Sequence, residues 1–154
     1  MNDTSDSAPA VEIQVAPVGL FQTNAWFLRR VDRDEVIIVD PGSDAEQLID
    51  TIDSSGWKPV AILNTHGHID HVGAVEPLRR RYGIPFYLHP ADGYLLDSLA
   101  ASAHRWGIPV PEQPQIDRPL VGDEVLELAG LVIEALATPG HTPGGVSFVV
   151  AGHV

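Results

Sequence analysis

Short apolar segments separated by polar turns run along the whole chain. They predict strands at residues 12–18, 23–30, 35–39, 60–64, 85–88, 124–128, 131–137 and 146–150. Three intervening segments carry apolar residues at helical spacing and predict helices at residues 43–56, 73–82 and, more loosely, 91–103. Strands and helices alternate early and hairpins dominate late, which favours a layered α/β fold.

Some connections between these elements contain residues with strong local preferences. Ser43 and Glu46 have the spacing of a capping box, which predicts the start of a helix. Residues 107–119 hold four prolines and predict an irregular loop. Asp40 opens an Asp-Pro-Gly sequence at the end of an expected strand. It either forms a turn or orients a metal ligand through a hydrogen bond, and the sequence leaves both roles open.

Composition is that of an ordinary globular domain. The chain has 154 residues, 44% of them hydrophobic, which is enough for one domain with a core. We expect residues 1–10 to form a disordered acidic tail rather than a signal peptide, and residues 11–154 to form the domain. No run of 18 apolar residues occurs, so we expect no membrane partner and a cytoplasmic location.

Charge and the lack of cysteine narrow the partners and the chemistry. The net charge of −12 repels phosphate backbones and argues against a nucleic-acid partner. The basic cluster at residues 79–81 lies near the end of an expected helix, where it complements the helix dipole. Without cysteine there are no disulfides or thiolate ligands, so a metal site must use nitrogen and oxygen donors.

Candidate chemistry gathers in the run from Thr65 to His71. Its sequence is Thr-His-Gly-His-Ile-Asp-His, directly after an expected buried strand. Histidine is the commonest metal ligand in proteins, and Gly67 lets the backbone turn sharply. A surface loop that happens to be rich in histidine is the alternative. Three histidines and an aspartate at one strand end favour a metal pocket.

The spacing His-x-His-x-Asp-His after a threonine resembles the signature of the metallo-β-lactamase superfamily of metallo-hydrolases. Residues 138–144, Thr-Pro-Gly-His-Thr-Pro-Gly, resemble the second motif of that family. The resemblance implies a four-layer αββα sandwich of the metallo-β-lactamase type. It also implies a two-metal site at one edge of the two packed sheets.

The resemblance assigns a metal ligand to five positions of this sequence. The first metal would be bound by His66, His68 and His141. The second would be bound by Asp70 and His71, and Asp40 is the candidate to orient a ligand histidine if it does not serve as a turn former. Two divalent ions are therefore expected, with zinc first and iron or manganese as alternatives.

Three segments look most like the glyoxalase II-like, or hydroxyacylglutathione hydrolase, branch of the family: residues 40–42, 65–73 and 138–145. Members of that branch hydrolyse thioesters such as S-lactoylglutathione. The resemblance thus implies a small thioester substrate and attack by a metal-bound hydroxide, with Asp70 as the catalytic carboxylate that accepts a hydrogen bond from the attacking water. Three alternatives stay open: a persulfide dioxygenase-like enzyme with one iron, a lactonase or lactamase on the same fold, and a non-catalytic module.

One part of the family pattern is missing from the sequence. The family uses a further aspartate, which bridges the two metals, and a last histidine, and both would lie beyond Val154. We therefore expect the C-terminal part of the sandwich to be missing and the activity of these 154 residues to be weak. An unfinished second sheet would also leave an unpaired strand edge, which suggests self-association.

Overall fold

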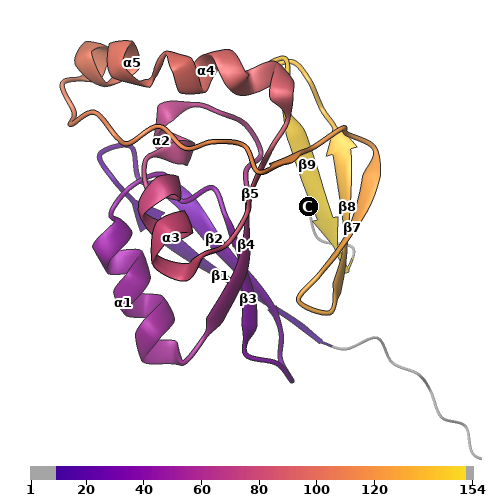
Figure 1. The fold of residues 1–154 in the computed structure, drawn as a ribbon. Coiled ribbons are helices and arrows are strands. Elements are labelled where there is room, and N and C mark those ends of the chain that lie inside the picture. Colours follow the sequence, from indigo (N-terminus) through magenta and orange to yellow (C-terminus); the bar gives the residue numbers. More distant parts are fainter. Residues whose placement is uncertain (1–9, 152–154) are drawn as a thin grey trace, which may run out of the picture.

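Two β-sheets pack face to face, and helices cover the outer face of one of them (Figure 1). This computed structural model describes residues 10–151. The tail expected at residues 1–10 therefore lies, apart from Ala10, outside the described residues. The layered α/β class predicted from the sequence is confirmed.

The larger sheet has six strands in the order β1–β2–β3–β4–β5–β6. They are β1 (Val11–Val18), β2 (Thr23–Arg30), β3 (Glu35–Val39), β4 (Lys58–Leu63), β5 (Phe86–Leu88) and β6 (Arg118–Pro119). The first three strands pair antiparallel, whereas β3 to β6 pair in parallel through crossover connections. β3 is buried at four of its five positions because both faces of this part of the sheet are covered.

The smaller sheet has three antiparallel strands, β7 (Glu124–Leu128), β8 (Leu131–Ala137) and β9 (Val146–Val150), in that order. Burial alternates along β8, so Leu131, Ile133 and Ala135 face the larger sheet. There they pack in one cluster with Leu28, Ile37, Val39 and Leu63. Within residues 10–151, β9 pairs with no strand other than β8.

Helices cover the face of the larger sheet that points away from β7–β9 (Figure 1). They are α1 (Ala45–Ser55), α2 (Ile69–Val72), α3 (Val75–Tyr82), the 3₁₀ turn η1 (Pro90–Asp92), α4 (Gly93–Asp97) and α5 (Leu99–Trp106). Leu48 of α1 and Leu78 of α3 are fully buried in this layer. The described residues thus form a helix layer and two sheets. None of these helices is long and apolar enough to cross a bilayer.

The capping box predicted at residues 43–46 is wrong. Asp44, and not Ser43, precedes α1, and it adopts a left-handed backbone with φ of 52°. Its carboxylate makes no capping bond and instead accepts a hydrogen bond from the backbone N–H of Gly19 at 2.8 Å. A tertiary contact with the turn between β1 and β2 therefore replaces the local cap.

One predicted helix starts two residues later than expected, and another is divided. The helix expected at residues 73–82 is preceded by α2, and α3 starts afresh because Pro77 has no N–H to bond the carbonyl of Gly73. The looser helix expected at residues 91–103 is η1, α4 and α5, with a break at Ser98. The proline-rich segment is irregular, as predicted, apart from the short strand β6.

Candidate metal centre

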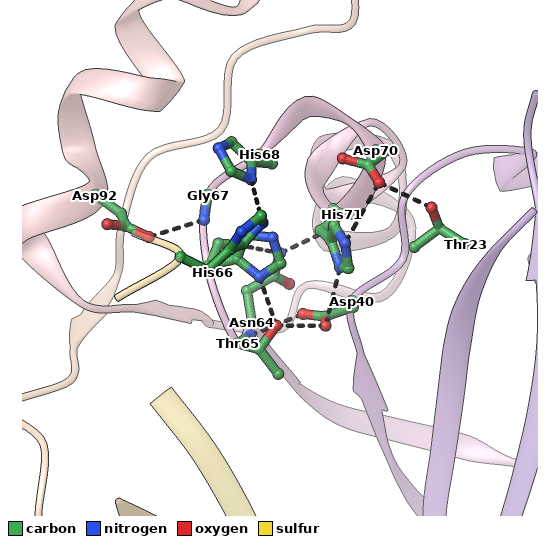
Figure 2. Close-up of polar contacts among 11 residues, drawn as sticks. Thr23, Asp40, Asn64, Thr65, His66, Gly67, His68, Asp70, His71 and Asp92 are labelled. Carbon is green, nitrogen blue, oxygen red and sulfur yellow. Dashed lines mark hydrogen bonds and ion pairs between the residues drawn. The ribbon is translucent and has the colours of Figure 1, made fainter. Parts of the chain in front are cut away.

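The histidine run lies where β4 leaves the larger sheet (Figure 2). Asn64 follows β4 and is fully buried. Its side-chain amide donates to the carbonyl oxygens of His71 at 2.7 Å and of His66 at 3.3 Å. These bonds close residues 64–71, here called the first loop, so that the rings of its histidines pack against one another.

Ring nitrogens from two loops meet at one point. His141 lies in residues 138–145, here called the second loop, which connects β8 to β9. Its Nε2 lies 3.1 Å from His68 Nδ1. Three ring nitrogens lie within 4.8 Å of one another, one each from His66, His68 and His141. Two nitrogens that bind one tetrahedral zinc ion lie roughly 3.3 Å apart, so the spacing fits a shared ion.

His66 presents a lone pair that no group in residues 10–151 uses. The hydroxyl of Thr65 donates to Asp40 Oδ2 at 2.6 Å, so its oxygen accepts from His66 Nδ1, 2.9 Å away. The proton of His66 therefore sits on Nδ1. His66 Nε2 is buried and has no hydrogen-bond partner in the described part of the chain. Because a buried acceptor without a partner is costly, this atom is well suited to bind a metal.

Asp40 organises the other side of the first loop. This carboxylate is 4% exposed. It accepts from the backbone N–H of Thr65 at 2.8 Å, from the Thr65 hydroxyl, and from His71 Nδ1 at 3.1 Å. Of the two roles open for Asp40, this geometry is that of an orienting partner, although its φ of 52° is also the backbone of a turn residue.

The two residues expected at the second metal lie side by side. His71 Nδ1 donates a hydrogen bond to Asp40, and His71 Nε2 on the other side of the ring faces Asp70, whose Oδ2 lies 3.4 Å away. The same carboxylate oxygen accepts a hydrogen bond from the hydroxyl of Thr23 at 3.0 Å (Figure 2). The structure therefore brings together all five residues that the sequence proposed as ligands, in a group of three and an adjacent pair.

Electrostatics separate the histidines of the first loop into two kinds. Burial, reinforced by the charge of His71, lowers the pKa of His66 to about 4. Burial also lowers the pKa of His68. Burial alone would lower the pKa of His71 too, but its hydrogen bond to Asp40 and the charges of Asp40 and Asp70 raise it above the usual value. Because metals bind neutral imidazole, the lowered pKa values favour metal binding by His66 and His68, whereas the raised pKa of His71 opposes it.

Two buried polar residues support these loops without belonging to any sequence motif. Asn64 ends the strand expected at residues 60–64, and a polar residue after an apolar run was the available signal. Asp92, in η1, is one of 21 acidic residues and had no such signal. Asp92 is fully buried and contacts both loops.

A cleft of about 420 Å³ opens beside Asp70. Its walls are the turn between β1 and β2, residues 42–44, and residues 108–111 of the proline-rich segment. Leu20, Phe21 and other hydrocarbon side chains form most of the lining, and its only charged residues are aspartates. The cleft therefore suits an uncharged, largely apolar part of a small molecule.

The family model described as the Metallo-beta-lactamase superfamily matches residues 18–154, which include both loops. This chain therefore belongs to the metallo-β-lactamase superfamily, a superfamily of hydrolases. The family expected from the histidine run is confirmed.

Two relatives illustrate the similarity in sequence. The probable metallo-hydrolase YqgX of Bacillus subtilis is 41% identical over 136 residues, which are 87% of this chain and 63% of the relative. The hydroxyacylglutathione hydrolase GloC of Haemophilus influenzae is 36% identical over 141 residues, which are 90% of this chain and 66% of the relative. The chain thus spans less than two thirds of either relative.

Two solved structures illustrate the similarity in fold. The B3 metallo-β-lactamase BLEG-1 superposes with a TM-score of 0.82 at 37% identity, over 90% of this chain and 67% of that protein. TTHA1623, solved in a di-iron-bound form, superposes with a TM-score of 0.78 at 37% identity, over 88% of this chain and 66% of that protein. The metallo-β-lactamase fold is confirmed, and TTHA1623 shows that this fold can hold two metal ions.

Proposed function

We propose that this chain carries the metal-binding core of a thioester hydrolase of the hydroxyacylglutathione hydrolase type. The observation that carries the proposal is the convergence of three histidine nitrogens, one of them buried without a partner. Similarity to GloC supports a thioester as the substrate. The apolar cleft beside Asp70 offers space for an uncharged part of such a substrate.

The donor set fits divalent metal ions. His66, His68 and His141 would hold one ion, and Asp70 with His71 would contribute to a second. Nitrogen and oxygen donors without cysteine suit zinc, with iron and manganese as alternatives. When bound, such an ion lowers the pKa of a coordinated water toward neutrality and stabilises negative charge on a carbonyl oxygen.

The surrounding residues hold protons and orient side chains. Asp40 keeps the proton of His71 on Nδ1, which leaves Nε2 as a lone pair. Thr23 fixes one oxygen of Asp70, and the other oxygen, which accepts no hydrogen bond from residues 10–151, can accept one from a water molecule at the cleft. The chain thus provides both the ligands and an acceptor that orients the attacking water.

The proposed reaction needs little help for its leaving group. The oxygen of water bonds to the thioester carbonyl carbon, and the carbon–sulfur bond breaks. The sulfur leaves as a thiolate and takes one proton of the water, which yields a carboxylic acid and a thiol. Because a thiol such as that of cysteine has a pKa of about 8.5, its thiolate leaves readily without a strong general acid.

Release of thiol from S-lactoylglutathione by the zinc-loaded chain tests the proposal. We expect measurable hydrolysis that falls by more than roughly 100-fold in His66→Ala, since loss of a ligand should exceed the loss of an outer partner. His104→Ala is the matched control, because this exposed histidine of α5 lies outside the centre. A chain that holds zinc but never releases thiol would contradict the proposal.

A second candidate is hydrolysis of a β-lactam. The similarity to BLEG-1, with a TM-score of 0.82 at 37% identity, favours it over other amide or ester reactions. The same zinc-loaded chain is assayed with a β-lactam at equal concentration. Faster turnover of the β-lactam than of the thioester would replace the first proposal with the second.

A further inference from the structure

Asp92 is a buried carboxylate that lies between the two loops of the centre. It ends η1 and is 0% exposed. Its Oδ2 accepts from the backbone N–H of Gly67 at 3.1 Å and from the hydroxyl of Thr142 at 2.7 Å (Figure 2 shows the contact with Gly67). Its Oδ1 accepts from the backbone N–H of Gly144 at 2.7 Å. One side chain therefore bonds the first loop and the second loop at the same time.

These contacts require a carboxylate. All three donors are neutral, and no cationic side chain in residues 10–151 forms an ion pair with Asp92. A buried charge is tolerated only when strong hydrogen bonds replace its hydration. An asparagine at this position would turn its NH₂ group toward at least one of the donors. It could therefore not accept all three hydrogen bonds that the carboxylate accepts.

Glycine allows each loop to come this close. A Cβ at Gly144 would lie 2.8 Å from Asp92 Oδ1, and a Cβ at Gly67 would lie 3.1 Å from the backbone oxygen of Asp92. Both glycines also donate their N–H groups to the carboxylate. The two loops are thus fitted to this residue from both sides.

The position of Asp92 bears directly on the three-nitrogen group. Gly67 lies between His66 and His68, and Thr142 follows His141, so Asp92 holds the neighbours of all three ligands. A further bond, from the N–H of Val146 at the start of β9 to the carbonyl of Thr65 in the first loop at 2.8 Å, lies at the base of the two loops. We propose that Asp92 is a positioning residue: it sets the distance between the loops at which His141 reaches His66 and His68.

This inference rests on the metal centre proposed above, but not on the reaction. It predicts a selective effect, because the polar partners of His71, Asp70 and Asp40 within residues 10–151 do not include Asp92. A residue that merely stabilised the fold would weaken metal binding equally whether or not His141 is present.

A double-mutant cycle separates these roles. The Zn²⁺ affinity of the metal-free chain is measured by competition with a chromophoric chelator for the unaltered chain, Asp92→Asn, His141→Ala and the double variant. We expect Asp92→Asn to weaken binding by roughly 10- to 100-fold in the unaltered chain. In the His141→Ala background the same substitution should have little further effect, because the ligand that it positions is gone.

Asp117→Asn is the matched control. The carboxylate of Asp117 also accepts a backbone N–H, from Phe86 at 2.9 Å, and it bonds Arg79 at 2.6 Å, away from both loops. A loss of affinity in Asp117→Asn as large as in Asp92→Asn would overturn the inference. So would equal losses from Asp92→Asn in both backgrounds.

Two further results keep the test decisive. If His141→Ala leaves the Zn²⁺ affinity unchanged, the proposed metal centre is wrong. If His141→Ala weakens Zn²⁺ binding and Asp92→Asn does not, the metal centre stands and only the proposed role of Asp92 is wrong. Should Asp92→Asn not fold, Thr142→Val removes one of the three bonds with little change of shape. It should give a smaller loss with the same dependence on His141, and a loss without that dependence would overturn the inference.

Discussion

The first and second loops serve one centre but are held in different ways. The first loop contributes four of the five ligand candidates and is fixed by its immediate surroundings, Asn64 within it and Asp40 directly after the neighbouring strand β3. The second loop contributes His141 alone, which is exposed, and is held by a residue 50 positions away from Thr142. This difference shows that the residues that supply the ligands and the residues that position them can come from separate parts of the chain.

The largest effect we predict follows from the tight packing behind the first loop. A Cβ at Gly42 would overlap the backbone carbonyl of Asp70, whereas a Cβ at Gly144 would meet a side-chain oxygen, Asp92 Oδ1, at 2.8 Å. Backbone cannot move aside as a side chain can. Gly42→Ala should therefore cost more than about 3 kcal/mol of unfolding free energy, and Gly144→Ala about 1–3 kcal/mol. Urea unfolding of the metal-free chains measures both.

Gly93→Ala is the control for this pair. It lies at the start of α4 with φ of −55°, and an added Cβ would meet no atom within 4 Å. Alanine there should be neutral or stabilising by roughly 0.5–1 kcal/mol. If Gly42→Ala unfolded at the same urea concentration as Gly93→Ala, the first loop would not be the more tightly packed of the two.

How far the sequence predicts the site depends on how far each residue lies from its partners. The ligand candidates of the first loop could be identified because they are contiguous and follow a buried strand. His141 could be proposed only through the resemblance of its motif, since nothing local ties it to residue 66. Asp92 could not be found at all, because its partners lie 25, 50 and 52 residues away.

The fold shows the same dependence. All strands except the short β6 were predicted within a few residues, because alternation and apolar runs are local signals. The start of α1 was wrong because Asp44 bonds Gly19, a contact that spans 25 residues. Local sequence patterns therefore predict the helices, the strands and the first loop, whereas the contacts that connect these elements are seen only in the structure.

A smaller effect should follow from Asp40→Asn. The substitution keeps the size of the side chain, and asparagine tolerates the left-handed backbone at this position. It replaces one of the two carboxylate oxygens that accept hydrogen bonds from Thr65 and His71 with an NH₂ group, which cannot accept. We expect Zn²⁺ affinity, measured by chelator competition, to fall by roughly 10- to 100-fold. Unlike the effect of Asp92→Asn, this loss should persist in the His141→Ala background, and its disappearance there would show that both carboxylates act on one ligand.

The smallest effect is a pH dependence that arises in the first loop. The pKa of His66 falls from 6.5 to about 4 on folding, so the unfolded chain binds more protons between these values, and stability should decrease as pH falls from about 6.5 to about 4. The pKa of His71 is raised, so its contribution to stability is complete below about pH 6.5 and decreases as pH rises through the folded value.

Unfolding of the metal-free chain in urea should therefore show greatest stability near pH 6.5. His71→Asn should abolish the decrease above that pH and keep the decrease below it. Stability that kept rising above pH 6.5 in the unaltered chain would mean that Asp40 does not hold a charged His71, and that the first loop is fixed by neutral hydrogen bonds, as the second loop is by its neutral donors to Asp92.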